Sequence, residues 1–226
     1  PPGRAAASAP TGRSPPVGGH CAGTPPAAAP LTNKDSILIA DFVNSTGDPV
    51  FDDALRQAVA VQLQQSPFIT LLPDQRVQRT LRLMQRPPEE RVTRPIAREI
   101  AQRDQLKALI AGSIAGLGAN YVISLEAVNA TTGDVVAREQ AEAASKEQVL
   151  TMLGVATARL REKLGESLAS VQKFDVPLAR ATTPSLEALH SYSLALDEGR
   201  FVNRLDAIPH LKRALAAVKQ VRGVIR

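Results

Sequence analysis

Residues 106–144 read LKALIAGSIAGLGANYVISLEAVNATTGDVVAREQAEAA, and this stretch decides the fold. Its first part, 106–117, is a continuous apolar run, which is typical of a buried strand. Apolar residues then alternate with others over 121–128, and the turn that follows carries Gly133, where a hairpin needs a positive φ. We therefore expect an antiparallel meander, with a last strand over 135–144.

The residues before this stretch predict strands joined by helices. Short apolar runs at 36–42 (SILIADF) and 68–72 (FITLL) indicate two more strands, and apolar residues recur at helical spacing over 50–65. Further helices are expected to open at Pro73 and near Thr93. Strands joined by helices should be parallel. The expected fold class is α/β, with a mixed sheet of about five strands and packed helices.

Four segments are expected along the chain. Residues 1–34 are rich in Pro and Ala and predict a disordered linker, because they offer little apolar surface to bury. Residues 35–170 form the α/β domain, 171–183 a polar linker, and 184–226 a C-terminal helical hairpin. The chain begins with Pro rather than Met, so we expect it to be a piece of a longer protein or a processed product.

Charge and cysteine content exclude several classes of protein. The net charge is +5, but residues 200–226 carry seven Lys and Arg against one acidic residue, and 31–199 are slightly acidic. The basic end therefore gives little support for nucleic-acid binding by the folded body. Cys21 stands alone, so an internal disulfide and a cysteine zinc site are excluded. No apolar stretch approaches the ~18 residues of a membrane span.

Several motifs occur in an order that resembles a known family. They are IADF at 39–42, NSTGD at 44–48, AGSI at 111–114, YVISLEAVN at 121–129 and TTGDVV at 131–136. Together they resemble the TolB amino-terminal and curli-secretion (CsgG-like) α/β domains. The resemblance covers the chain from about Asp35 to Leu168. It implies a domain of the bacterial cell envelope.

The C-terminal part extends this resemblance to one subset of proteins. VQKFD at 171–175 and ATTPSLEAL at 181–189 resemble the junction, in large bacterial eukaryotic-like serine/threonine kinases, between this domain and tetratricopeptide repeats. Ala207, Leu211 and Ala214 match the small–large–small pattern of a first repeat. The resemblance implies a kinase domain and a membrane span upstream, and an extracytoplasmic location for this chain. A membrane would be reached only through that upstream segment.

The best candidates for a ligand site lie after the first strand. Asn44, Thr46 and Asp48 follow it, and ligands of open α/β sheets bind outside the carboxyl ends of parallel strands. The neighbouring acids Asp52 and Asp53 also suit a helix start, where negative charge is favoured. Their spacing fits no calcium-loop pattern, so neither a metal nor a cofactor is predicted.

A partner surface is expected on helical segments. Arginines recur at helical spacing between residues 73 and 86, with acidic residues interleaved, so a solvated charged face is the alternative reading. No aromatic residues accompany them, which disfavours nucleic acid. The residues predicted to contact a partner are Arg76, Arg79, Arg82, Arg86, Tyr192 and Leu211.

The sequence shows no catalytic set. Kinase motifs and phosphate-loop motifs are absent, and the three histidines are scattered, so this chain is expected not to be an enzyme. We expect a non-catalytic ligand- or protein-binding region of a signalling protein, as sensor or scaffold. The alternative is a cell-envelope assembly module that self-associates. A protein partner is predicted, and a small-molecule ligand is left open.

Overall fold

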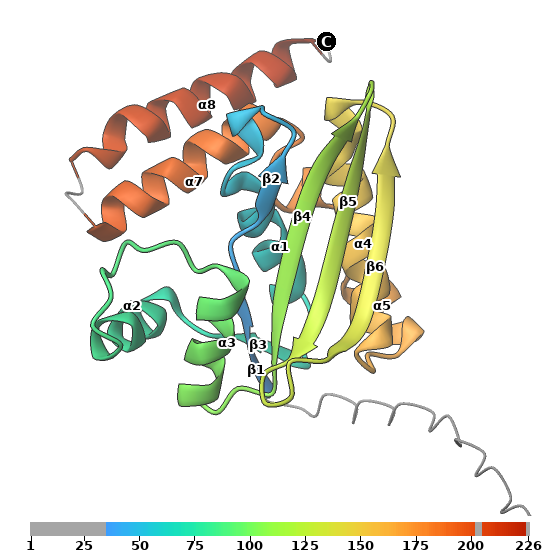
Figure 1. Cartoon of the computed structure of the whole chain (residues 1–226). Coiled ribbons are helices and arrows are strands. Elements are labelled where there is room, and N and C mark those ends of the chain that lie inside the picture. Colours follow the sequence, from blue (N-terminus) through green and yellow to red (C-terminus); the bar gives the residue numbers. More distant parts are fainter. Residues whose placement is uncertain (1–34, 202–204, 225–226) are drawn as a thin grey trace, which may run out of the picture.

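The computed structural model describes residues 35–201 and 205–224 (Figure 1). Six strands form one sheet: β1 (Asp35–Ile39), β2 (Val43–Ser45), β3 (Ile69–Leu71), β4 (Ala108–Leu117), β5 (Asn120–Asn129) and β6 (Val135–Ala143). The α-helices are α1 (Ala54–Gln64), α2 (Asp74–Leu83), α3 (Arg94–Arg103), α4 (Val149–Lys163), α5 (Leu168–Phe174), α6 (Leu178–Ala181), α7 (Leu186–Phe201) and α8 (Ala207–Val224). Short 3₁₀ helices, η1 (Pro49–Phe51) and η2 (Lys146–Gln148), precede α1 and α4.

The sheet is mixed, as the sequence predicted. Its strand order is β3-β1-β4-β5-β6, and β2 pairs with the second half of β4. β1 runs parallel to β3 and to β4, and β4, β5 and β6 form the antiparallel meander. β2 is an addition to the strands expected from the sequence. The α/β fold class is confirmed.

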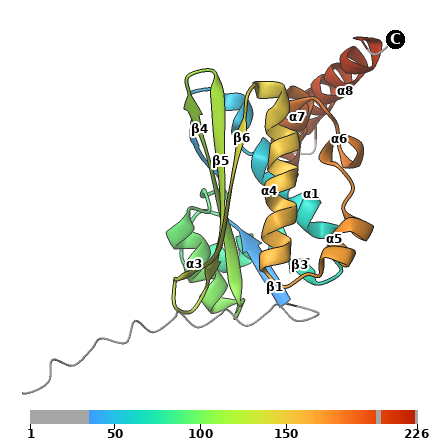
Figure 2. The same cartoon turned by 90° about the vertical axis from the view of Figure 1, so that its right-hand side faces the viewer.

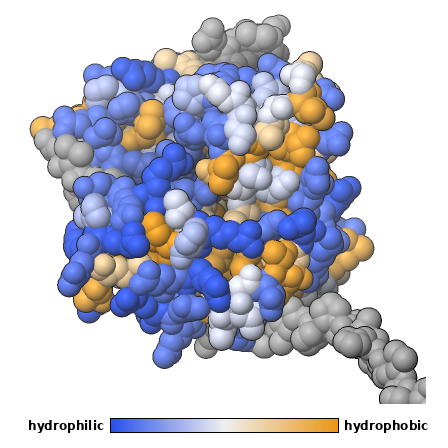
Figure 3. Space-filling model, viewed as in Figure 1, coloured by the Kyte–Doolittle hydropathy of each residue, from blue (hydrophilic) through white to orange (hydrophobic). Residues whose placement is uncertain are grey.

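Helices cover the two faces of the sheet unequally (Figure 2). α1 and α4 pack on one face over its whole height, in a core that includes Leu55, Ile110 and Leu153. α2 and α3 pack on the other face in a second core. Figure 2 shows α3 beside only the lower half of the strands. The upper half of that face is uncovered, and Figure 3 shows hydrophobic surface over β4 and β5 there.

The stretch expected to be a polar linker, 171–183, is helical and packed instead. It holds the end of α5 and the whole of α6, and both Val171 and Leu178 are buried. Leu178, Leu186 and Leu189 belong to the same core as α1 and α4. The first half of α7 therefore packs into the body, and α8 folds back on α7 as the expected hairpin. Its tetratricopeptide type stays a prediction, and residues 1–34 lie outside the described part.

A buried ion pair fastens α5 to the body. The side chain of Arg161, near the end of α4, is fully buried and donates to both carboxylate oxygens of Glu166, at 2.9 and 2.8 Å. Ser66 and Ser170 also donate to Glu166. Burial alone would raise the pKa of Glu166, but these hydrogen bonds outweigh it and hold the pKa below its usual value. Arg161 also reaches Asp175 at 3.3 Å.

One close approach to β4 depends on a glycine. A Cβ atom on Gly112, in the middle of β4, would lie 2.2 Å from the ring of Phe42. Phe42 is buried and follows β1 in the chain. The ring therefore occupies the space that a side chain at position 112 would need.

The outer edge of the sheet is β6, and polar groups protect it. Four of its nine residues have charged or amide side chains: Arg138, Glu139, Gln140 and Glu142. Lys163 of α4 reaches across to the strand. The Lys163 ammonium donates to the backbone carbonyl of Arg138 at 2.7 Å and pairs with Glu139 at 2.6 Å. Charged edges of this kind disfavour pairing with another strand.

Candidate functional site

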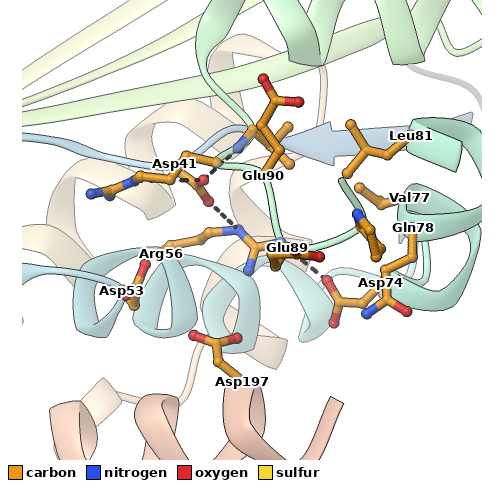
Figure 4. A pocket seen from close by; sticks show the side chains of 13 residues that line it. Asp41, Asp53, Arg56, Asp74, Val77, Gln78, Leu81, Glu89, Glu90 and Asp197 are labelled. Carbon is orange, nitrogen blue, oxygen red and sulfur yellow. Dashed lines mark hydrogen bonds and ion pairs between the residues drawn. The ribbon is translucent and has the colours of Figure 1, made fainter. Parts of the chain in front are cut away.

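The clearest cavity lies at the carboxyl end of β1. There the chain changes faces, because α1 leads from β1 to β3 on one face while α2 and α3 lead from β3 to β4 on the other. Ligands of open α/β sheets bind at such switch points. The cavity has a volume of about 290 Å³. We call it the acidic crevice; its lining residues are Asp41, Asp53, Arg56, Asp74, Val77, Gln78, Leu81, Pro88, Glu89, Glu90, Arg91, Val92 and Asp197 (Figure 4).

Arg56 of α1 lies at the centre of the acidic crevice. Its Nη2 donates to Asp74, at the start of α2, at 3.1 Å. Its Nε lies 3.4 Å from Asp41, which is close enough for an ion pair but without hydrogen-bond geometry. Burial alone would lower the pKa of Arg56, but Asp41 and Asp74 outweigh burial and raise it. The guanidinium is therefore a fixed cation that joins α1, β1 and α2.

Asp53 is the strained acid of the acidic crevice. It precedes α1 with φ +58°, a left-handed conformation that few non-glycine residues adopt. Its carboxylate makes no hydrogen bond or ion pair within the described part of the chain, and its side chain does not cap the helix. Burial, and then the nearby Asp41, raise the pKa of Asp53. The charged form of Asp53 is therefore less stable in the folded protein than in water.

Asp53→Asn is expected to raise the free energy of unfolding at pH 7, by less than about 1 kcal/mol because the site is partly solvated. A carboxyl group whose pKa is higher in the folded than in the unfolded state costs stability as pH rises through that range. Asn keeps the left-handed backbone but removes the charge. Urea unfolding at pH 7 and at pH 3 measures the effect.

The gain from Asp53→Asn should be smaller at pH 3, where the folded protein already holds Asp53 protonated. Asp134→Asn, in the exposed hairpin after β5, serves as the control and should change stability little at either pH. A loss of stability at pH 7 in Asp53→Asn would show that the charge at this helix start is favourable instead.

Carboxylates outnumber cations in the lining of the acidic crevice. Six carboxylates line it against the two guanidinium groups of Arg56 and Arg91. Within residues 35–201 and 205–224, no group of three or more His, Cys, Asp or Glu residues has the arrangement of a metal site. No hydroxyl side chain in that part donates to a histidine ring. The arrangement suits the binding of a positively charged side chain.

The three residues predicted to bind a ligand lie beside the acidic crevice, in a turn that satisfies its own polar groups. Asn44 Oδ1 accepts from the backbone N–H and the hydroxyl of Thr46, at 3.0 and 2.7 Å. Asn44 Nδ2 donates to the carbonyl of Asp48 and to the carboxylate of Asp52. Asp48 accepts from the N–H of Val50 and so caps η1. Ligand binding by this turn stays a prediction.

The same turn positions the C-terminal hairpin. Lys146 of η2 pairs with Asp48 at 2.8 Å and lies 3.6 Å from Glu187 of α7. The hydrogen bond from Lys146 and the backbone N–H of Val50 lower the pKa of Asp48. His190 of α7 also makes a 3.0 Å contact from its Nδ1 to the carbonyl of Asp52. These contacts give the turn a structural role in holding α7.

A second hollow, of about 420 Å³, opens on the uncovered half of the sheet. It shares Asp41 and Arg91 with the acidic crevice and is also lined by Asn44. Glu126 of β5 lies on its floor and pairs with Arg94 at 3.0 Å and with Arg138 at 2.5 Å. The carboxylate of Glu126 is therefore neutralised by Arg94 and Arg138.

The residues predicted to contact a partner divide into paired and free groups. Arg76 pairs with Asp104, and Arg86 pairs with Glu90. Arg79 and Arg82 lie exposed on α2, and no ion pair of theirs occurs among the described residues. Tyr192 is 41% exposed on α7, and Leu211 is 46% exposed on α8. Contact of these residues with a partner stays a prediction.

The structure adds three apolar neighbours to Leu211. Leu205 is 67% exposed, Ile208 41% and Leu215 56%. Residues three and four apart lie on one side of a helix, so Ile208, Leu211 and Leu215 form a stripe that Leu205 extends. We call these four residues the α8 stripe. Ala207 and Ala214, one turn before and one turn after Leu211, are buried and partly buried, so the α8 stripe borders the side of α8 that is covered. The spacing of the stripe residues can be seen in the sequence, but the exposure of their side chains cannot.

Comparisons with known proteins give no family assignment. No family model matches the chain, and no curated protein matches it. Among solved structures, the LpoB C-terminal domain from Salmonella enterica matches with TM-score 0.46 and 16% identity, over 50% of this chain and 84% of that chain. The lipoprotein GNA1162 from Neisseria meningitidis matches with TM-score 0.42 and 15% identity, over 60% and 99%.

TolB, the protein whose amino-terminal domain the sequence motifs resemble, is also similar. TolB from Acinetobacter baumannii matches with TM-score 0.40 and 12% identity, over 61% of this chain and 30% of that chain. All three TM-scores are below 0.5, so the functional argument rests on the geometry of this chain. The kinase context stays a prediction. Within the described residues, no helix has the length and apolar character needed to cross a membrane.

Proposed function

We propose that this chain is a non-catalytic protein-binding module that docks through its C-terminal hairpin. The observation that carries the proposal is the α8 stripe: three exposed apolar side chains on α8 and Leu205 just before it. Scattered exposed leucines need no explanation, but contiguous apolar residues on one face mark interaction sites. A helix that presents such a face suits another helical or grooved surface.

The body of the domain supports the hairpin as a rigid platform. The first half of α7 is buried in the main core through Leu186 and Leu189. Lys146 and His190 add polar contacts between α7 and the body. A stripe on a fixed helix loses less conformational entropy on binding than one on a loose segment.

Of the two settings suggested by the sequence resemblance, we propose the assembly module in the cell envelope over the signalling sensor. A sensor for a small molecule needs a largely apolar pocket with a few free polar groups. The acidic crevice is instead occupied at its centre by Arg56, which is held by Asp41 and Asp74. The apolar surface available for binding lies on α8. An extracytoplasmic location is part of this proposal.

A photo-crosslinking residue placed at position 211 tests the docking surface. The full chain carrying it is mixed with envelope extract and irradiated, and the products are identified by mass spectrometry. We expect one discrete protein to be joined at position 211. Leu215→Ser in the same chain should reduce the yield at least about tenfold, because side chains near the centre of an interface dominate binding.

Position 83 is the matched control. Leu83 ends α2 and is 70% exposed, so it is as apolar and as accessible as the stripe residues but lies on another helix. Little product should form there. Equal products at positions 83 and 211, or none at 211, would contradict docking through the hairpin.

A further inference from the structure

Two surfaces of the chain carry opposite charge. Beside the α8 stripe lie the exposed cations Lys212 and Lys219, and the one acid among residues 205–219 is Asp206. The acidic crevice carries six carboxylates against the guanidinium groups of Arg56 and Arg91, and one of the six, Glu90, also pairs with Arg86. Opposite potentials on two surfaces favour their contact and disfavour contact between two α8 helices, which would both be basic.

The acidic crevice also suits a long basic side chain by shape. Val77, Leu81, Pro88 and Val92 supply apolar lining, and the carboxylates lie around them (Figure 4). Lys and Arg side chains bury their apolar stems and place their charge at a polar rim. The unpaired carboxylate of Asp53 is already raised in energy by burial and by Asp41, so a neighbouring cation would relieve it.

The two surfaces are close together on the molecule. Asp197 of α7 lines the acidic crevice, and α8 packs on α7. Figure 1 shows α8, α7 and α2 in succession down one side of the molecule. A two-fold axis through that side places the basic surface of each copy opposite the acidic surface of the other. Such an interface is closed and self-complementary.

We propose that two copies of this chain form a closed dimer in which α8 of each copy lies against the acidic crevice of the other. This inference rests on the proposed function, because it uses the same docking surface, the α8 stripe. It adds the partner, which is a second copy of the chain. Each dimer contains the contact twice, and both contacts bury the stripe together with Lys212 and Lys219.

Charge reversal with exchange tests the dimer. The full chain is studied by sedimentation equilibrium as wild type, as Lys212→Glu with Lys219→Glu, and as Glu89→Lys with Glu90→Lys. We expect a wild-type dimer that weakens at high salt and a dimer Kd raised at least about tenfold in each reversed variant. Mixing the two reversed variants should restore a dimer, because both contacts then join opposite charges again.

Arg159→Glu with Arg180→Glu is the control, since these exposed cations lie on α4 and α6, and it should leave the dimer unchanged. A monomeric wild type up to about 100 µM, or reversed variants that dimerise normally, would overturn the inference. In that case a different protein crosslinked at position 211 would leave the proposed function standing. Sedimentation of a monomer with anionic but not neutral lipid vesicles would overturn both.

Discussion

Arg161→Ala is expected to lower the free energy of unfolding by about 3–5 kcal/mol, because it leaves the carboxylate of Glu166 buried without its cation. Ser66 and Ser170 cannot neutralise that charge, although both donate to it. Asp175 loses the same partner, so α5 should also loosen from the body. Urea unfolding followed by circular dichroism measures the loss.

Two further variants separate the charge from the helix that carries it. Arg159→Ala removes an exposed arginine from the same helix and should change stability by less than about 0.5 kcal/mol. Arg161→Met combined with Glu166→Leu removes both charges and should recover much of the loss. A double variant as unstable as Arg161→Ala would show that the wider network matters more than the unpaired charge.

Gly112→Val is expected to cost about 1–3 kcal/mol or more, because its side chain would occupy the space of the Phe42 ring. The ring is buried between β4 and the core and cannot move to solvent without exposing apolar surface. Valine is otherwise favourable in a strand, so the loss would report the close approach alone. Thermal unfolding compared with wild type measures it.

Gly116→Val is the matched control for Gly112→Val. Gly116 lies on the same strand, and a Cβ atom there would meet no other atom within 4 Å. This variant should be neutral or slightly stabilising. Phe42→Leu should reduce the penalty of Gly112→Val, since the smaller side chain leaves room. Equal losses at positions 112 and 116 would mean that the strand itself resists valine.

Apolar patterning explains why most of the sheet could be predicted. Residues 121–128 alternate with period two, and 106–117 form an apolar run with a length suited to a strand. β2 could not be predicted, because it has only three residues, Val43, Asn44 and Ser45, and two of them are polar. They form a strand only by pairing with β4, which is distant in the sequence. Propensity is weak for such short edge strands.

The packing of residues 171–183 and the acidic crevice depended on contacts between distant segments. Leu178 is a single apolar residue in a polar stretch, and only the core of α1 and α4 makes it buried. Asp41 and Asp74 follow parallel strands, so the sequence alone could have placed them at one edge. Arg56 and Asp197 could not be predicted from the sequence to line the acidic crevice, because their positions depend on how α1 and α7 pack against that edge.

The protected β6 edge limits how this protein can grow into larger structures. Lys163 donates a hydrogen bond to the carbonyl of Arg138, and the charged side chains along β6 disfavour pairing with another strand. Open-ended stacking of strands, the route to fibrils, is therefore blocked at the long edge. Contacts through helices are unaffected by this protection; they are made by side chains and can be discrete and reversible. The chain is thus suited to assemblies of finite size.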